Sequence, residues 1–241
     1  MSFTNLRIRY QSARSLPAPY AYFYTLTARS VGNEVKIDLA ITYPDRDDID
    51  DDELIAEGFT RDDDFKWSGQ LPNAWLQALT DVADKTRLQP LDEDQLGEED
   101  EFWELTLSDG KSGKPANADD WQYLVQELIQ ATYEADKRER PFELTFLDID
   151  NRGTVHDLVL TASFADRMVV VRDAGNPRAG SRTLPWSTLQ RVMSTVYSVD
   201  FDPQSTLDRR PKTSGQWLNL GTDDWYDLRQ QPKVSRVLKD L

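Results

Sequence analysis

Carboxylates are the side chains whose number and spacing could do chemistry in this sequence. They recur in pairs two residues apart, and clustered oxygen atoms of this kind are what hard cations such as Ca²⁺ and Mg²⁺ require. The chain has no cysteine and one histidine, so any metal site that needs thiolates or two imidazoles is excluded. The candidate metal ligands are Asp48, Asp50, Asp52, Asp62 and Asp64.

Two further motifs look chemical but favour structural roles. Residues 148–153 (DIDNRG) begin like a calcium loop, yet its fifth position is Arg152 and its twelfth is Val159, neither of which is an oxygen ligand of that motif. We interpret this segment as a hairpin turn in which Gly153 has a positive φ. The sequence has no G-x-S-x-G motif, so the single His156 has no serine nucleophile for which it could act as the base. The sequence therefore predicts no cofactor and favours a protein without catalytic machinery.

The charge is strongly segregated along the chain. There are 43 acidic and 28 basic residues, a net charge of −15, but residues 141–241 hold 13 of each and are neutral. Residues 45–64 contain eleven acids and two arginines, and residues 92–109 contain nine acids and no base. Such a field attracts a basic protein or cations and repels nucleic acid. We expect partner contacts from the following residues of the acidic half: Asp47, Asp51, Glu98, Glu99, Asp100, Trp67 and Trp103.

The segregated charge leads to one main hypothesis and leaves two alternatives. The leading hypothesis is a non-enzymatic binding or scaffold protein whose acidic first half contacts a basic partner or cations. The first alternative is a Mg²⁺- or Ca²⁺-dependent enzyme that acts through its carboxylates on phosphate or sugar substrates. The second is a platform for single-stranded nucleic acid on the neutral half, with tryptophans on strands stacking against bases. Nucleic acid is not expected on the acidic half.

Hydrophobic periodicity predicts the elements that position these residues. Residues 35–43 alternate apolar and polar, as a strand with one buried face does, and the apolar spacing becomes helical after Pro72. The second half repeats this change, with a helix after Pro185 and a last one after Pro232. We also expect helices that start at the aspartate pairs 119–120 and 223–224. A short helix is expected near residues 53–59, inside the first acidic run.

Four weak sequence matches recur in the same order and indicate an internal duplication. They equate residues 26–42 with 144–161, 71–77 with 184–190, 102–108 with 216–221, and 119–126 with 223–230.

The predicted fold is α+β: an antiparallel sheet with helices packed on one face, in two tandem pseudo-repeats. Each repeat reads strand, strand, strand, an optional fourth strand, helix, strand, helix. The halves are residues 1–140, acidic, and 141–241, neutral, and the sequence leaves open whether they form one continuous domain. No apolar run is long enough to span a membrane, and no secretory signal is visible, so we expect a cytoplasmic protein without membrane contact.

Overall fold

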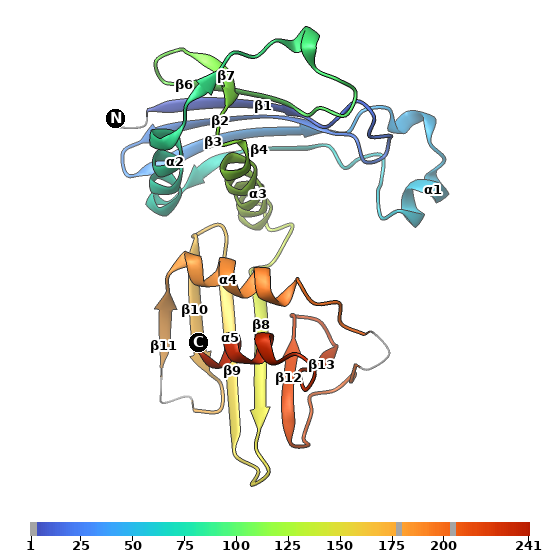
Figure 1. Cartoon of the computed structure of the whole chain (residues 1–241), viewed down its shortest axis with the longest axis vertical. Helices are drawn as coiled ribbons and strands as arrows, with labels where there is room; N and C mark the ends of the chain where they lie inside the picture. The colour runs from blue at the N-terminus through green and yellow to red at the C-terminus, as the bar shows by residue number, and fades with distance from the viewer. Residues whose placement is uncertain (1–3, 177–179, 203–205) are drawn as a thin grey trace. The chain divides into compact units, whose positions relative to one another are not determined.

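A computed structural model describes residues 4–176, 180–202 and 206–241. The chain divides into two compact units, residues 1–132 and 133–241. The predicted boundary between residues 140 and 141 lies later, in the connection that precedes the first strand of the second unit. Each unit has its own antiparallel sheet and is described separately (Figure 1).

The first unit is built on a seven-stranded antiparallel sheet with the strand order β4-β3-β2-β1-β6-β7-β5. Alternate residues along its long strands are buried, which explains the period-two pattern of the sequence. Its strands are β1 (Asn5–Gln11), β2 (Phe23–Val31), β3 (Glu34–Thr42), β4 (Phe65–Leu71), β5 (Leu88–Gln89), β6 (Phe102–Leu107) and β7 (Ser112–Pro115). Strand β1 was not anticipated from the sequence, although Leu6, Ile8 and Tyr10 alternate with polar residues.

Two long helices, α2 (Asn73–Lys85) and α3 (Ala118–Ala135), cover one face of this sheet (Figure 1). Pro72 is the N-cap residue of α2, and α3 begins beside the aspartate pair 119–120, as predicted. Trp75 and Trp121 are fully buried, so both tryptophans belong to the core between helices and sheet. The short helix α1 (Asp51–Ala56) and the 3₁₀ turns η1 (Arg46–Asp48) and η2 (Glu93–Gln95) lie in the acidic connections.

The second unit has a six-stranded antiparallel sheet in the order β11-β10-β9-β8-β12-β13. Gly153 has a φ of 81° in the turn between the first two strands, which confirms the predicted hairpin. The strands are β8 (Phe142–Ile149), β9 (Val155–Ser163), β10 (Met168–Asp173), β11 (Ser181–Leu184), β12 (Gly215–Asn219) and β13 (Trp225–Asp227).

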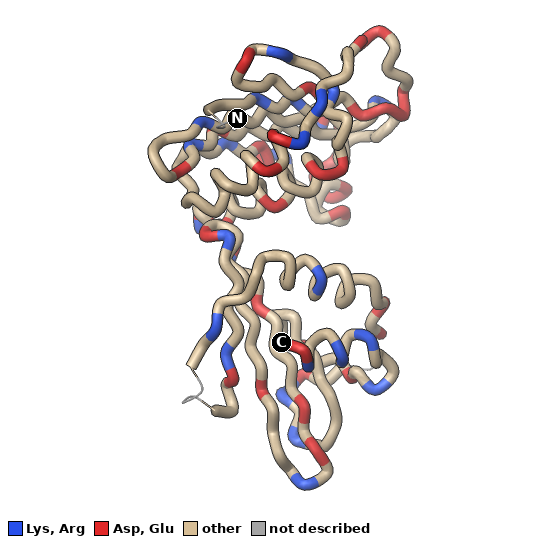
Figure 2. The backbone as a smooth tube through the Cα atoms, turned by 60° about the vertical axis from the view of Figure 1, so that its left-hand side comes forward, with Lys and Arg blue, Asp and Glu red and all other residues tan. Residues whose placement is uncertain are grey.

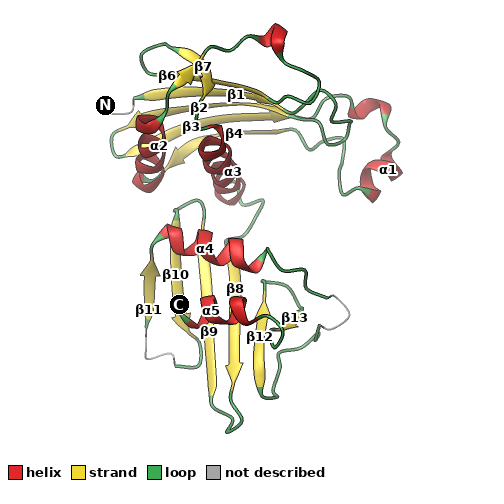
Figure 3. Cartoon of the chain, in the orientation of Figure 1, coloured by secondary structure: helices red, strands yellow, loops and turns green. Residues whose placement is uncertain are grey.

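Helices α4 (Trp186–Val196) and α5 (Pro232–Lys239) lie on one face of the second sheet (Figure 3). Both begin at the predicted prolines, Pro185 as N-cap residue and Pro232 in the first turn. The helix predicted at Asp223 and Asp224 was wrong. The chain there enters strand β13, because Trp225 pairs with Asn219 of β12 and with Leu207.

The α+β class, with helices on one face of an antiparallel sheet, is confirmed, and the two units share one topology. When α1, the 3₁₀ turns and β5 of the first unit are left out, four strands, a helix, two strands and a helix follow each other in both. The order β4-β3-β2-β1-β6-β7 then corresponds to β11-β10-β9-β8-β12-β13. The edge strand β5, the helix α1 and the 3₁₀ turns are additions of the first unit. A duplication would produce this equivalence, and it stays a prediction about the origin of the chain.

The common topology supports two of the four sequence matches and contradicts the other two. Residues 71–77 and 184–190 both join a fourth strand to a helix, and residues 102–108 and 216–221 both contain the fifth equivalent strand. The match of 26–42 with 144–161 is displaced by one strand, and that of 119–126 with 223–230 equates a helix with a strand. The missed strand β1 explains the displacement.

Within the described residues, none of the helices combines the length and the apolar character that crossing a bilayer demands.

Candidate functional site

The two acidic segments emerge at the same end of the first sheet. Strand β1 ends where β2 begins, β3 ends where β4 begins, and the start of β6 is paired with the end of β1. The pairs Gln11–Phe23, Gln11–Phe102 and Ile41–Phe65 fix this alignment. The connections 12–22 and 43–64 therefore leave and re-enter the sheet at this end, and the connection 90–101 reaches it where the chain enters β6. We call these three connections the acidic end. Figure 2 shows their acidic residues along the loops of the first unit.

The connection 12–22 holds the two acidic segments in place. The amide of Ser15 donates to the carbonyl oxygen of Glu98 at 2.9 Å, which fixes the segment 90–101. The hydroxyl of Tyr20 donates to the Glu57 carboxylate at 2.6 Å, which fixes the segment 43–64. These two hydrogen bonds connect both acidic segments to the connection 12–22.

Arg46 is the principal anchor of the segment 43–64. Its side chain is 3% exposed, although it lies in the most acidic stretch of the chain. Its guanidinium donates to the carbonyl oxygen of Pro19 at 2.9 Å, to that of Thr60 at 2.8 Å, and to the Asp63 carboxylate. It also lies over the ring of Tyr43, 4.0 Å from the centroid. A buried guanidinium with several partners fixes the path of the chain around it.

The charge of Asp63 depends on this anchor. Burial by itself would raise the pKa of the Asp63 carboxyl, but hydrogen bonds from Thr60 and from the Arg46 guanidinium lower it below its ordinary value. Asp63 therefore stays ionised as the counter-ion of Arg46.

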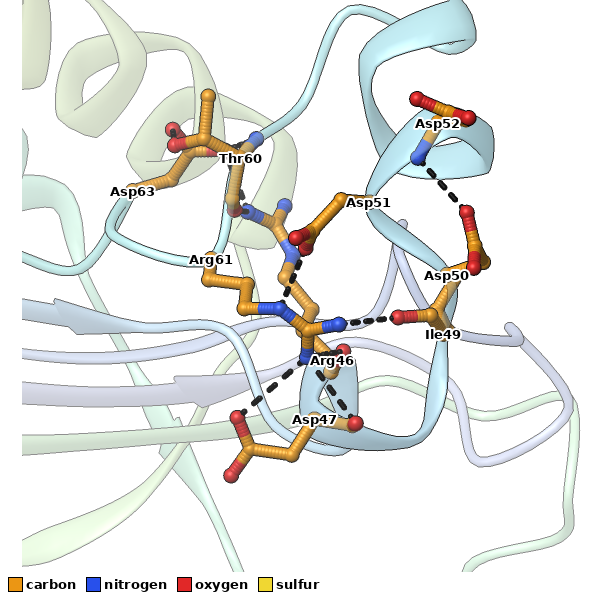
Figure 4. Close-up of polar contacts among 9 residues, drawn as sticks. All are labelled: Arg46, Asp47, Ile49, Asp50, Asp51, Asp52, Thr60, Arg61 and Asp63. Atoms are coloured by element: carbon orange, nitrogen blue, oxygen red, sulfur yellow. Dashed lines mark hydrogen bonds and ion pairs between the residues drawn. The ribbon is translucent and has the colours of Figure 1, made fainter.

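Arg61 organises the outer part of the same segment (Figure 4). Its guanidinium donates to the carbonyl oxygens of Arg46 and Asp47, both at 3.0 Å, and of Ile49 at 2.6 Å. It also forms an ion pair with Asp51 at 2.5 Å and a longer one with Asp47 at 3.8 Å. The two arginines of the acidic run are thus internal fasteners that hold the segment together. Asp47 and Asp51 were predicted as partner contacts, but the ion pairs of both with Arg61 were not anticipated.

Two of the five candidate metal ligands stabilise local structure, and the other three are exposed. Asp50 is the N-cap of α1 and accepts from the amide of Asp52 at 2.9 Å, and Asp64 accepts from the amide of Tyr43 at 2.9 Å. Asp48, Asp52 and Asp62 are exposed. In the described ranges of the chain, acidic residues and histidine form no group of three or more that could hold a metal ion.

The second acidic segment leaves most of its carboxylates in solvent. Asp100 accepts from the amide of Gly97 at 2.9 Å, which shapes the loop, whereas Glu98 and Glu99 are exposed. Among the described residues, neither glutamate has an ion pair. These two carboxylates are therefore the most available charges among the predicted partner contacts.

Trp103 was predicted as a partner contact, but it lies in the core. It is 4% exposed, and its indole N–H donates to Glu101 at 3.3 Å. The same carboxylate accepts from the hydroxyl of Tyr10 at 2.8 Å, and burial together with this hydrogen bond raises the pKa of Tyr10 far above its ordinary value. Trp67 is half-buried and folds over Gly69, where it borders a shallow hollow of ≈ 390 Å³. Of the two, only Trp67 is accessible.

Apolar side chains are exposed at the acidic end, and none of them was predicted as a site residue. Leu16, Phe23 and Ile55 are 39%, 41% and 66% exposed. Leu16 and Phe23 line a hollow of ≈ 350 Å³ between the connection 12–22 and the start of the segment 43–64, at the small end of the range for ligand pockets. The period-two pattern of β2 could have predicted that Phe23 faces outward, because the next residue, Tyr24, is buried.

The two strand tryptophans of the neutral half are buried. Trp217 and Trp225 are each 8% exposed and form a buried cluster with Leu147 and Ile149. This cluster lies on the sheet face opposite the helices, since it alternates with the residues that pack against α4 and α5. The alternative of base stacking on strand tryptophans therefore has no exposed ring at these two positions.

Comparisons of the chain with protein-family models, with curated proteins and with solved structures found no match.

Proposed function

We propose that this protein is a non-enzymatic binding protein, and that its acidic end docks a basic segment of a protein partner. The observation that carries the proposal is that both acidic segments reach one end of the first sheet, where Leu16, Phe23 and Asp45 line a hollow. Residues 45–64 and 92–101 hold eleven and seven acids against two arginines, both of which are used internally.

The hollow adds shape to the charge. A purely electrostatic surface attracts any polycation, with little discrimination and strong screening by salt. Leu16 and Phe23 offer an apolar contact beside these carboxylates, so a partner gains most if it combines lysine or arginine with an apolar anchor. The expected partner segment is therefore basic and amphipathic.

The internal fasteners support the proposal because they preorganise the surface. Arg46, Arg61 and the connection 12–22 hold the acidic segments before any partner arrives. A fixed surface avoids part of the entropy cost of ordering loops on binding. The carboxylates that remain in solvent, such as Glu98 and Glu99, are then the ones that meet the partner.

The test uses two synthetic probes, an amphipathic peptide of leucine and lysine and a polylysine of equal charge. We expect the full-length protein to bind the amphipathic peptide more tightly, and binding of both to weaken as salt rises from about 0.05 to 0.5 M. The variant Glu98→Gln/Glu99→Gln/Asp100→Asn weakens both. The control Asp81→Asn/Asp119→Asn/Asp200→Asn removes the same charge at exposed positions outside the acidic end, and it leaves binding nearly unchanged.

The variant Leu16→Ser separates the hollow from the charge. It should weaken the amphipathic peptide several-fold and leave polylysine unaffected, because only the former inserts an apolar side chain. Fluorescence anisotropy of labelled probes measures both. If the control triple weakens binding as much as the acidic-end triple, the protein acts by net charge alone and the proposed docking site is wrong.

A further inference from the structure

The first unit carries a second surface of opposite character, on the face of its sheet that points away from α2 and α3. In strands β1 to β4 and β6, the residues that alternate with the buried core point to this side, and none of them is buried. We call it the open face. Its charged residues are Arg7, Arg9, Arg29, Lys36 and Lys66, together with Glu34, Asp38 and Glu104; Lys114 of β7 extends it.

Two of the three acids on the open face are already engaged. Glu104 forms an ion pair with Arg9 at 3.1 Å and accepts from Ser112 at 3.0 Å. Asp38 accepts from the hydroxyl of Ser68 at 2.5 Å and lies 3.8 Å from Lys36. The third, Glu34, is exposed at the far end of β3.

On β1 to β4 and β6 three cations are left without an acid: within the described part of the chain, Arg7, Arg29 and Lys66 form no ion pair. In a unit with a large acidic excess, a face with more bases than acids is a local reversal of sign.

Three cations follow a line along β1 and β2, and the register places Lys66 of β4 level with Arg9 but three strands away. Arg9 and Arg7 are successive open-face residues of β1, and the register places Arg29 of β2 opposite Asn5, one step further along. Successive residues on one side of a strand are about 7 Å apart. A ladder of cations at this spacing suits a linear polyanion better than a compact anion.

Two aromatic rings, one exposed and one half-buried, lie at one end of the ladder. Phe102 and Phe23 are on the same face as Arg9 and flank Gln11, with which both are paired in the register. Phe23 is 41% exposed, and the guanidinium of Arg9 lies 5.1 Å from the centroid of the Phe102 ring. Cations together with exposed rings on an antiparallel sheet are the combination that holds single-stranded nucleic acid, through phosphates and stacked bases.

We infer that the open face of the first sheet binds single-stranded nucleic acid, with Arg7, Arg29 and Lys66 on phosphates and the phenylalanine rings on bases. The carboxylates of the acidic end border the ring side of this face and oppose the strand there, so binding is weak. At about 50 mM salt we expect a dissociation constant within roughly 10⁻⁶–10⁻⁴ M, without strong sequence preference. An acidic peptide could pair with the cations, but its carboxylates would not stack on the phenylalanine rings.

The experiment measures fluorescence anisotropy of a labelled 12-nucleotide single strand with the full-length protein. Three phosphate contacts predict a slope of log K against log salt of about −2. Arg7→Ala/Arg29→Ala/Lys66→Ala removes most of this slope, whereas Lys85→Ala/Arg87→Ala, exposed positions outside the strands of the open face, leaves it intact. Phe102→Leu weakens binding about tenfold, because it removes a stacking surface.

The outcomes separate this inference from the proposed function. The acidic-end triple Glu98→Gln/Glu99→Gln/Asp100→Asn should keep or improve nucleic-acid binding while it loses the basic peptide. No binding tighter than about 1 mM at 50 mM salt overturns the inference. So does competition by polyglutamate of equal charge as effective as that by unlabelled strand, which would assign the face to acidic peptides. A circular dichroism spectrum identical to the parent shows that each variant is folded.

Discussion

The two sheets have the same strand order and one helix-covered face each, but their second faces differ. On the first sheet this face carries arginine, lysine and threonine side chains, and all of them are at least partly exposed. On the second sheet the corresponding face holds the buried cluster of Leu147, Ile149, Trp217 and Trp225, and this part of the face is covered.

The cover of the second sheet is the segment 206–214, which we call the strap. Leu207 pairs with Trp225 through two backbone hydrogen bonds of 3.0 Å at the edge of the sheet. Arg210 then lies over the Trp225 ring, 5.4 Å from its centroid, and forms an ion pair with Asp157 on β9 at 2.5 Å. Since β12 and β8 separate β13 from β9, the strap crosses this face.

The comparison teaches that topology fixes the order of the strands and leaves the second face free to diverge. Large apolar side chains on the second sheet require a cover, and the strap supplies it. Polar and cationic side chains on the first sheet need none, so that face stays available for a ligand. The predictions that follow test this contrast, beginning with the largest effect.

Truncation of the buried cluster tests whether the covered face is a true core. Trp217→Ala should lower the free energy of unfolding by about 3–5 kcal/mol, because it removes a large buried ring and leaves a cavity. Thr106→Ala on the equivalent strand of the first sheet should change it by less than about 0.5 kcal/mol. Urea unfolding followed by circular dichroism measures both. Equal effects would abolish the distinction between the two faces.

The second largest effect concerns the connection between the third and fourth strands, which is long and acidic in the first unit. Arg46→Met should cost about 3 kcal/mol, because it leaves Asp63 and two carbonyl oxygens without their buried partner. Arg61→Met, whose side chain is 37% exposed, should cost about 1 kcal/mol. A reversed order would show that the outer fastener, and not the buried one, holds the acidic end.

Sequence periodicity could predict most of this architecture, because one buried face leaves a clear pattern. The alternation of Val35, Ile37 and Leu39 identified β3, and Pro185 and Pro232 marked two helix starts. Strand β1 obeys the same rule but was passed over. The aspartates at 223 and 224 misled, since they precede a strand whose tryptophan is held by pairing across the sheet.

The candidate site was predictable in its charge and not in its geometry. Composition located both acidic runs, but only the register of β1 and β6 shows that they meet. The role of Arg46 could not be deduced from the sequence, because its partners are backbone carbonyl oxygens of Pro19 and Thr60, which are distant in the sequence. Trp103 was misread for a related reason: its burial depends on Tyr10 of the unanticipated strand.

The strap provides a smaller test of the covered face. Arg210→Ala should lower the free energy of unfolding by about 2 kcal/mol, because it leaves the carboxylate of Asp157, 7% exposed, without its cation. Arg172→Ala, at an exposed position on the same face, serves as the control and should be nearly neutral. Urea midpoints compare the two. A neutral Arg210→Ala would mean that the strap is held by Leu207 and Trp225 alone.

The smallest expected effect is a difference in acid sensitivity between one aspartate of each unit. Burial would raise the pKa of both Asp63 and Asp227, but hydrogen bonds lower each below its ordinary value of 3.8, chiefly from Thr60 and Arg46 for Asp63 and from Arg229 for Asp227. A carboxyl whose pKa is lower in the folded state stabilises the protein at any pH above the pKa of the unfolded state. This contribution is lost as the pH falls through the pKa of the folded state.

Each charge-removing variant should therefore flatten the loss of stability between about pH 5 and pH 2. Asp63→Asn should flatten it more than Asp227→Asn, because Arg46 is 3% exposed whereas Arg229 is 79% exposed and screened by solvent. Urea midpoints of the parent and both variants at several pH values measure the difference. An equal or larger effect of Asp227→Asn would show that the buried arginine does not set the acid sensitivity of the first unit.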